Sequence, residues 1–475
     1  MNSYFLIKSR KTQEKSIKTG LIVMWKFNSI IILNILILLP KIVMSDDTHY
    51  KDMLFGGRAA GMGGTYIAIS DDTAGCFYNP AGTIYAYEDS ISGSGNAFFS
   101  QKYNIEDIPK PLGEETGSYE RVGESFLANF FGILRKHDDF TYCFVYLIPE
   151  TNSEHQFLSI NENVWQYELD WNLEDTSYLA GPSLAYSFSD SISWGLGLFY
   201  HYRLGRFNNT EHTNYDFDSD GIQDTSANFF HRGEIKEHGF LYKLGLQWNP
   251  VDEIVFGFVF DQTVIQNSLY TKVSSGTAYN WIYSDGYSGG YQLASENKSH
   301  RSVPIHYGFG AAYYPTPSTM YAFDIDYYSS TSTNIPFGFP NNNYTVILPF
   351  SQVESAETAE VINNSFSQTL RLSETYNYSL GLETYINAEN SLSFGFFSNN
   401  TSAPDAGEST AYYYDHIDMI GLSGAYSSHT PNSTFTTGLV LTKGEGNLIV
   451  NHFLPRKINT FPISRSSWAL FIAVN

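Results

Sequence analysis

The residues best suited to chemistry in this 475-residue chain are carboxylates at alternate positions. They follow the pattern D-x-D-x-D-G-x-x-D in the run Asp216-Phe217-Asp218-Ser219-Asp220-Gly221-Ile222-Gln223-Asp224. Ca²⁺ takes about six to eight oxygen ligands, and a glycine permits the sharp turn that brings them together. The ligands would be the carboxylates of Asp216, Asp218, Asp220 and Asp224 and the carbonyl of Ile222. Ala227 stands where an EF-hand has its bidentate glutamate, so the spacing is closer to the repeats of secreted calcium-binding modules. The pattern predicts a structural Ca²⁺ site, and the alternative is a solvated acidic loop.

Two further patterns are too incomplete to predict an enzyme. The run 286–290 matches G-x-S-x-G, but it lies in a Ser/Gly/Tyr-rich stretch without the helix that a hydrolase nucleophile requires. Glu237 and His238 are neighbours, so on a strand they would point to opposite faces rather than to one metal ion. We therefore assign no catalytic residue and expect no required cofactor.

Cys76 and Cys143 are the two cysteines, too few for a disulfide framework or a zinc site. An exported protein passes through an oxidising compartment, where the two could pair. Their separation along the chain leaves the pairing open.

Composition favours a β protein with an unusual surface. Charged residues make up 16% of the chain, against about 25% in a typical globular protein. The chain has 36 tyrosines, 35 phenylalanines and 38 glycines, and the mean hydropathy is −0.23. Membrane β-barrels alternate lipid-facing and lumen-facing residues, so their mean hydropathy is unremarkable. The net charge of −22 argues against a nucleic-acid partner, because phosphate binding needs a basic surface.

The elements that the sequence predicts most clearly are β-hairpins, so any functional site must be positioned by them. Pairs of apolar or alternating runs are separated by short turns of Asn, Asp, Pro and Ser. These pairs are 126–134 with 141–148, 177–188 with 192–200, 238–248 with 255–264, 303–314 with 320–328, 376–385 with 392–397, and 417–426 with 435–441. An opening strand near 90–101 and a closing strand at 465–474 bring the expected number to about fourteen, counted from these runs.

The connections on the other side of these hairpins are long and polar. They cover roughly 102–120, 150–176, 206–232, 269–302, 332–368, 401–413 and 447–462. Short turns at one end and long loops at the other are typical of an outer-membrane barrel. The sequence therefore predicts an all-β transmembrane antiparallel barrel over residues 90–475. The alternative is a secreted β-solenoid or tandem sandwich, which would not explain the difference in loop length.

The first 45 residues read as a targeting signal. Met24 and Lys26 precede an apolar run over about 29–39, and Pro40, Lys41 and Ser45 follow it. A basic start, a short apolar core and small residues near the exit are typical of a secretory signal peptide. We expect residues 1–45 to be that signal, with translation starting at Met24. The alternative is an N-terminal membrane anchor.

Residues 46–89 form a segment rich in small residues before the first expected strand. Its most distinctive runs are Gly57-Arg58-Ala59-Ala60-Gly61-Met62-Gly63-Gly64, Asp71-Asp72 and Asn79-Pro80-Ala81-Gly82. With these runs, and more loosely with 183–186, 194–198 and 245–250, the chain from about residue 52 onward resembles the FadL-type outer-membrane transporters of hydrophobic compounds.

The resemblance implies a fourteen-stranded barrel whose N-terminal segment, the hatch (46–89), lies within the lumen. The hatch residues that match are Gly61, Gly63, Gly64, Asn79, Pro80 and Ala81. It also implies passive uptake across the outer membrane of hydrophobic molecules such as long-chain fatty acids. The expected partners are outer-membrane lipids with an anionic outer leaflet and the ligand itself, and a monomer is favoured. The alternative function is that of a surface barrel serving interaction or protein secretion.

Overall fold

The computed structural model describes residues 48–109, 116–162, 165–216, 223, 225–266, 272–283, 288–297, 301–334, 369–408, 413–453 and 456–475. Its helical elements are α3 (Gly57–Gly61), α4 (Gly75–Tyr78) and the 3₁₀ helix η1 (Pro80–Tyr85). Its strands are β1 (Ser90–Pro109), β2 (Thr116–His137), β3 (Phe140–Glu162), β4 (Trp165–Ser189), β5 (Ile192–Tyr215), β6 (Thr225–Val251), β7 (Ile254–Ile265), β8 (Lys272–Tyr283), β9 (Ser288–Asn297), β10 (His306–Thr316), β11 (Thr319–Tyr328), β12 (Thr331–Asn334), β13 (Thr369–Leu372), β14 (Thr375–Asn387), β15 (Asn390–Asn399), β16 (Tyr413–His429), β17 (Thr434–Phe453) and β18 (Arg456–Val474). No helix within these ranges is long and apolar enough to cross a membrane.

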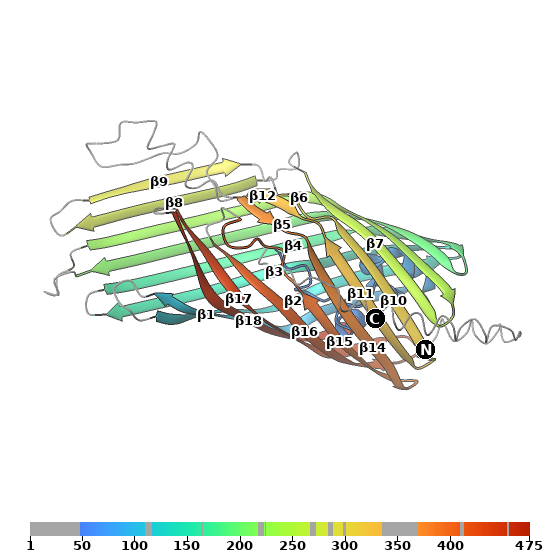
Figure 1. Cartoon of the computed structure of the whole chain (residues 1–475). Coiled ribbons are helices and arrows are strands. Elements are labelled where there is room, and N and C mark those ends of the chain that lie inside the picture. The colour runs from blue at the N-terminus through green and yellow to red at the C-terminus, as the bar shows by residue number, and fades with distance from the viewer. Residues whose placement is uncertain are drawn as a thin grey trace, which may run out of the picture.

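The strands close into a ring (Figure 1). The hydrogen-bonded order is β5-β4-β3-β2-β1-β18-β17-β16-β15-β14-β11-β10-β7-β6, and β6 pairs with β5 to complete it. This order contains fourteen strands, all antiparallel, which confirms the predicted barrel. Closure gives every strand a neighbour on both sides. A barrel in hydrocarbon surroundings needs this, because its backbone N–H and C=O groups cannot bond to water there.

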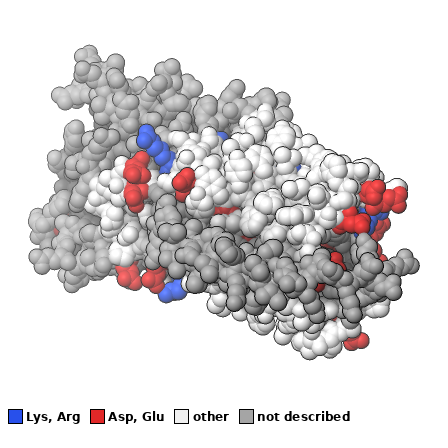
Figure 2. Space-filling view, turned by 45° about the vertical axis from the view of Figure 1, so that its right-hand side comes forward, with Lys and Arg blue, Asp and Glu red and all other residues white. Residues whose placement is uncertain are grey.

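The wall alternates between a lumenal and an outer face. On β18, Ala469 and Phe471 are buried, whereas Leu470, Ile472 and Val474 are about half exposed. The same alternation leaves large apolar side chains outside on β5, β6, β16 and β17. They include Leu196, Leu198, Leu244, Leu246, Ile420, Leu422, Leu439 and Leu441. The described surface is accordingly almost free of charge across its middle, and charged side chains lie toward its two ends (Figure 2). Such a surface suits a lipid environment.

The two ends of the barrel differ, although not as the sequence predicted. The short turns lie where expected, between the members of each hairpin. The stretches expected to be loops, such as 150–176 and 206–232, instead continue largely as strands. Strands β3 to β6 contain 23, 25, 24 and 27 residues, while about 9–11 residues cross a bilayer. The additional residues can pair because a ladder needs only backbone partners, whereas alternation of apolar and polar side chains is required only where one face is buried.

Strand β6 belongs both to the closed ring and to a part of the sheet that extends beyond it. Its residues 239–251 pair with β7 inside the ring, and its residues 225–236 pair with β8. The β8–β9 hairpin thereby widens the sheet beyond the ring at the end opposite the short turns (Figure 1).

The largest hydrophobic cluster of the described residues lies between the hatch and the wall. Phe55, Met62 and Tyr66 of the hatch belong to one buried cluster with Phe130 of β2 and Phe199 of β5. Hatch residues form no ladder pair with any of the described strands. The hatch is therefore held by side chains and close packing, and the wall is held by its own ladder.

Candidate ligand chamber

The hatch residues predicted from the sequence contact the wall in two separate places. Gly61 accepts a hydrogen bond at its carbonyl from Ser423 Oγ of β16 at 2.9 Å. Gly63 and Gly64 follow with φ of +69° and +74°, a left-handed conformation that favours glycine. A Cβ on Gly63 would lie 3.3 Å from the backbone of Gly395 on β15. This glycine turn therefore seats the hatch against β15 and β16.

The Asn-Pro-Ala run makes the second contact. Asn79 donates from Nδ2 to the Ile67 carbonyl at 2.8 Å and to the Leu246 carbonyl of β6 at 3.2 Å. Its Oδ1 accepts from the Ala81 amide at 3.2 Å, which caps η1, and Pro80 fits the first turn because it needs no donor there. Ala81 accepts from Ser193 Oγ of β5 at 2.8 Å. Strands β5 and β6 lie opposite β15 and β16 in the ring, so the hatch spans the lumen.

A disulfide between Cys76 of α4 and Cys143 of β3 joins the hatch covalently to the wall, with the two Cα atoms 5.9 Å apart. The pairing left open by the sequence is therefore made. It fixes α4, next to the Asn79 contact, to the lumenal face of β3.

Glycines in the wall let the hatch backbone come close. A Cβ on Gly245 would lie 2.1 Å from Asn79 Oδ1, one on Gly195 would lie 2.5 Å from the Ala81 amide, and one on Gly257 would lie 2.3 Å from the Ile67 carbonyl. No side chain fits at these distances. The absence of side chains on three neighbouring strands thus creates the seat for the hatch.

The wall has an interruption beside the hatch. Val122 of β2 pairs with His155 of β3, and Phe130 pairs with Leu147, with no ladder pair between β2 and β3 over the intervening described residues. Pro149 lies in this stretch, where the β3–β4 register shifts between Leu147 and Glu150. Proline removes a ladder donor, which explains a break at this position. Leu54 of the hatch lies behind the break, and its carbonyl accepts from Asn129 Nδ2 at 3.0 Å.

A cavity of about 180 Å³ lies between the hatch and the wall next to Pro149. One part of its lining is apolar, and the residues there are Met53, Leu54, Phe55, Ile67, Phe77, Tyr78, Leu179, Leu241 and Val259. Burial raises the pKa of the Tyr78 phenol well above its usual value, so this group stays neutral. We call this cavity the chamber.

The opposite part of the chamber is lined by a row of alternating charges. Lys243 Nζ lies 2.7 Å from Asp261, and the two ring nitrogens of His306 lie 2.8 Å from Asp261 and 2.9 Å from Asp326. Lys51 Nζ lies 2.5 Å from Asp326 and completes the row. Because both His306 nitrogens face carboxylates, the imidazolium is the form that suits this geometry. The row joins the hatch to β6, β7, β10 and β11.

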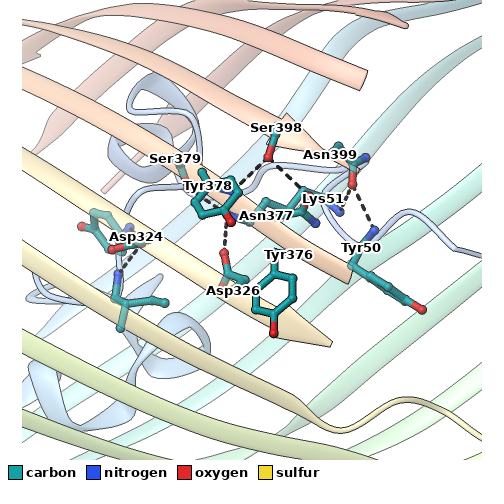
Figure 3. Close-up of polar contacts among 12 residues, drawn as sticks. Tyr50, Lys51, Asp324, Asp326, Tyr376, Asn377, Tyr378, Ser379, Ser398 and Asn399 are labelled. Carbon is teal, nitrogen blue, oxygen red and sulfur yellow. Dashed lines mark hydrogen bonds and ion pairs between the residues drawn. The ribbon is translucent and has the colours of Figure 1, made fainter. Parts of the chain in front are cut away.

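Residues 48–55, which we call the strap, lead the hatch along the chamber. The amides of Tyr50 and Lys51 donate to Asn399 Oδ1 at 3.1 and 3.0 Å, and Lys51 Nζ donates to Ser379 Oγ at 2.8 Å (Figure 3). Tyr50 stacks on Tyr328 with the ring centroids 4.1 Å apart. Side chains therefore hold the strap against the wall, and three of them, Tyr50, Lys51 and Tyr328, also line the chamber.

None of the strap or charged-row residues was predicted from the sequence. Lys51, Lys243, Asp261, His306 and Asp326 lie on five segments that are far apart in the sequence, so no local pattern joins them. The one available signal was a charged residue at a lumen-facing position of an otherwise apolar strand, as at Asp324 and Asp326 of β11.

The predicted calcium motif lies mostly outside the described residues. Asp218, Asp220, Ile222 and Asp224 fall there, and Asp216 directly follows the end of β5. Within the described ranges, no group of three or more His, Cys, Asp or Glu residues is arranged to hold a metal. The Ca²⁺ site stays a prediction.

Solved structures share this architecture. A FadL homologue from Pseudomonas aeruginosa matches with a TM-score of 0.56 and 11% identity over 90% of this chain and 99% of its own. The fold is that of the FadL-type channels. The Pseudomonas putida toluene transporter TodX matches this chain with a TM-score of 0.55 and 14% identity, over 88% of this chain and 97% of its own. The Ralstonia pickettii toluene transporter TbuX gives 0.51 and 11%, over 88% and 97%. No family model and no curated protein matches the sequence.

Proposed function

We propose that this FadL-type barrel is an outer-membrane channel for the passive uptake of small hydrophobic molecules. The observation that carries the proposal is the chamber behind an interrupted wall, at the break between β2 and β3. An apolar ligand would gain about 0.8 kcal/mol for each methylene buried there. The apolar outer face of the wall supports an outer-membrane location, reached with the help of the signal peptide expected in residues 1–45.

Chamber size bears on the class of ligand. An apolar cavity of about 150 Å³ in another protein holds benzene, so about 180 Å³ suits a molecule with one ring. TodX and TbuX, which share the fold, are named as toluene transporters. A long-chain fatty acid would need more room, which displacement of the strap would provide. We therefore place single-ring compounds first and long-chain fatty acids second.

Uptake by purified protein in liposomes tests this proposal, with radiolabelled toluene and oleate as probes. Native mass spectrometry of the purified protein shows in parallel which lipids or fatty acids accompany it. A wall-closing variant carries Glu124→Cys and Ser153→Cys, which face each other if the Val122–His155 register continues. A matched control carries Leu439→Cys and Leu470→Cys, which are partners in an uninterrupted ladder.

We expect oxidation to stop uptake by the wall-closing variant and to leave the control and the wild type active. Uptake that persists in a fully cross-linked wall-closing variant would exclude the break as the route. The alternative function, an interaction or secretion-accessory role, draws support from the β8–β9 extension. It predicts no probe uptake by the wild type.

We also propose a structural Ca²⁺ at Asp216–Asp224. Closely spaced carboxylates repel one another unless a cation lies between them, so binding would order the connection between β5 and β6. Asp218→Ala with Asp220→Ala should increase proteolysis of this connection without unfolding the barrel. Equal cleavage of the wild type in Ca²⁺ and in EGTA would disprove the site.

A further inference from the structure

One side chain in the chamber lining has an unused hydrogen-bonding group. His201 of β5 lines the chamber with 5% of its surface exposed, and its Nδ1 has no hydrogen-bond partner among the described residues. Buried polar atoms of native proteins are nearly always paired, so an exception calls for an explanation.

His201 differs from the charged side chains that line the chamber with it. The charged side chains of the lining lie beside groups of opposite charge, as in the Lys243–Asp261 and Lys51–Asp326 pairs. Arg301 likewise lies 3.3 Å from Glu237. The ladder neighbours of His201 are Leu179 and Gly239, which offer no polar side chain. His201 therefore stands where the paired charges meet the apolar lining.

This arrangement selects among ligand chemistries. A hydroxyl both donates and accepts, so it satisfies an imidazole nitrogen in either tautomer. A carboxylate would have to give up its hydration in a lining where each cationic side chain already contacts an acidic one, which is costly. A plain hydrocarbon would leave the imidazole unpaired. Rotation of the ring about χ2, a broad torsion, brings either edge toward a ligand.

We propose that His201 binds the hydroxyl of a small, uncharged, single-ring alcohol or phenol whose ring lies on the apolar part of the chamber. This inference rests on the proposed function and names its ligand class. His201 is then the residue that distinguishes hydroxylated ligands from hydrocarbons of equal size.

Matched probes test the proposal on the full-length protein in detergent. Toluene, benzyl alcohol and benzoate share one ring and differ in the polar group, and isothermal titration gives their affinities. The variants are His201→Leu, which removes the hydrogen bond, and His201→Gln, which keeps one. His137→Gln, at the exposed end of β2, is the control for the loss of a histidine. Heat-modifiable migration shows that each variant is folded.

We expect the wild type to bind benzyl alcohol about tenfold more tightly than toluene, which corresponds to one net hydrogen bond, and to bind benzoate most weakly. His201→Leu should abolish the preference for the alcohol without weakening toluene binding, and His201→Gln should restore part of it. Equal wild-type affinities for benzyl alcohol and toluene, tightest binding of benzoate, or an unchanged preference in His201→Leu would each overturn the inference alone. If no probe binds to the wild type, the proposed function fails as well.

Discussion

Two neighbouring parts of the hatch are attached to the same wall in different ways. The part from Gly57 to Tyr85 is fixed by the Cys76–Cys143 disulfide and by backbone packed directly on wall glycines. The strap at 48–55 is held by polar side chains, chiefly Lys51 and Asn399, and it lines the chamber. Ile67, Phe77 and Tyr78 of the first part also line the chamber, but its contacts with the wall glycines leave no room for a ligand. The polar contacts of the strap can be exchanged with one. We infer that the anchored part closes the lumen and that the strap adjusts to what the chamber contains.

The largest effect should come from removing both parts together. Deletion of residues 46–85, combined with Cys143→Ser to avoid a free thiol, should leave a folded barrel because the hatch adds no ladder pair to the described wall. Single-channel conductance in planar bilayers should rise several-fold, while heat-modifiable migration persists. Complete loss of the barrel would show that the hatch is part of the wall structure, and the comparison would then fail.

A single methyl-bearing side chain in the wall should displace the anchored part alone. Gly245→Val places carbon atoms where Asn79 Oδ1 now lies, because even a Cβ would come within 2.1 Å. Overpacking of this kind costs about 1–3 kcal/mol, so the hatch should shift and conductance should increase. Gly424→Val is the matched control, because its nearest neighbour, Phe394, would lie 3.6 Å from the Cβ. Equal conductance of the two variants would show that the seat tolerates a side chain.

The sequence predicted those features that depend on residues close together in the chain, and it missed those that depend on contacts between distant segments. The fourteen strands and their turns followed from alternation and from turn residues such as Asn249 and Pro250, which act within a few positions. The extension of β3 to β6 was missed, since a solvated sheet needs no alternation. The Cys76–Cys143 bond depends on long-range contact and was left open by the sequence. The strap and charged row were missed because their contacts exist only once the barrel has closed.

Removal of the disulfide should loosen the anchored part without opening the strap. For Cys76→Ser with Cys143→Ser, we expect the free energy of local opening of α4 to fall by about 2–4 kcal/mol, as is usual for the loss of a native disulfide. Hydrogen exchange followed by mass spectrometry measures this for peptides covering 70–85 and, as an internal control, 48–56. Faster exchange in the strap peptide by the same factor would mean that the hatch moves as one body, contrary to the comparison.

The smallest and most local effect should come from the strap itself. Lys51→Met keeps most of the length of the side chain but removes the ammonium group that lies 2.5 Å from Asp326 and donates to Ser379. A buried carboxylate left without this partner is destabilising by about 3–5 kcal/mol, although His306 still faces Asp326 at 2.9 Å and offsets part of that loss. Exchange should therefore accelerate in the 48–56 peptide and remain unchanged in the 70–85 peptide. Asp326→Asn in the Lys51→Met background should recover part of the protection, because it removes the unpaired charge. If Lys51→Met instead accelerates exchange throughout the hatch, Lys51 supports the anchored part too, and the strap is not an independent element.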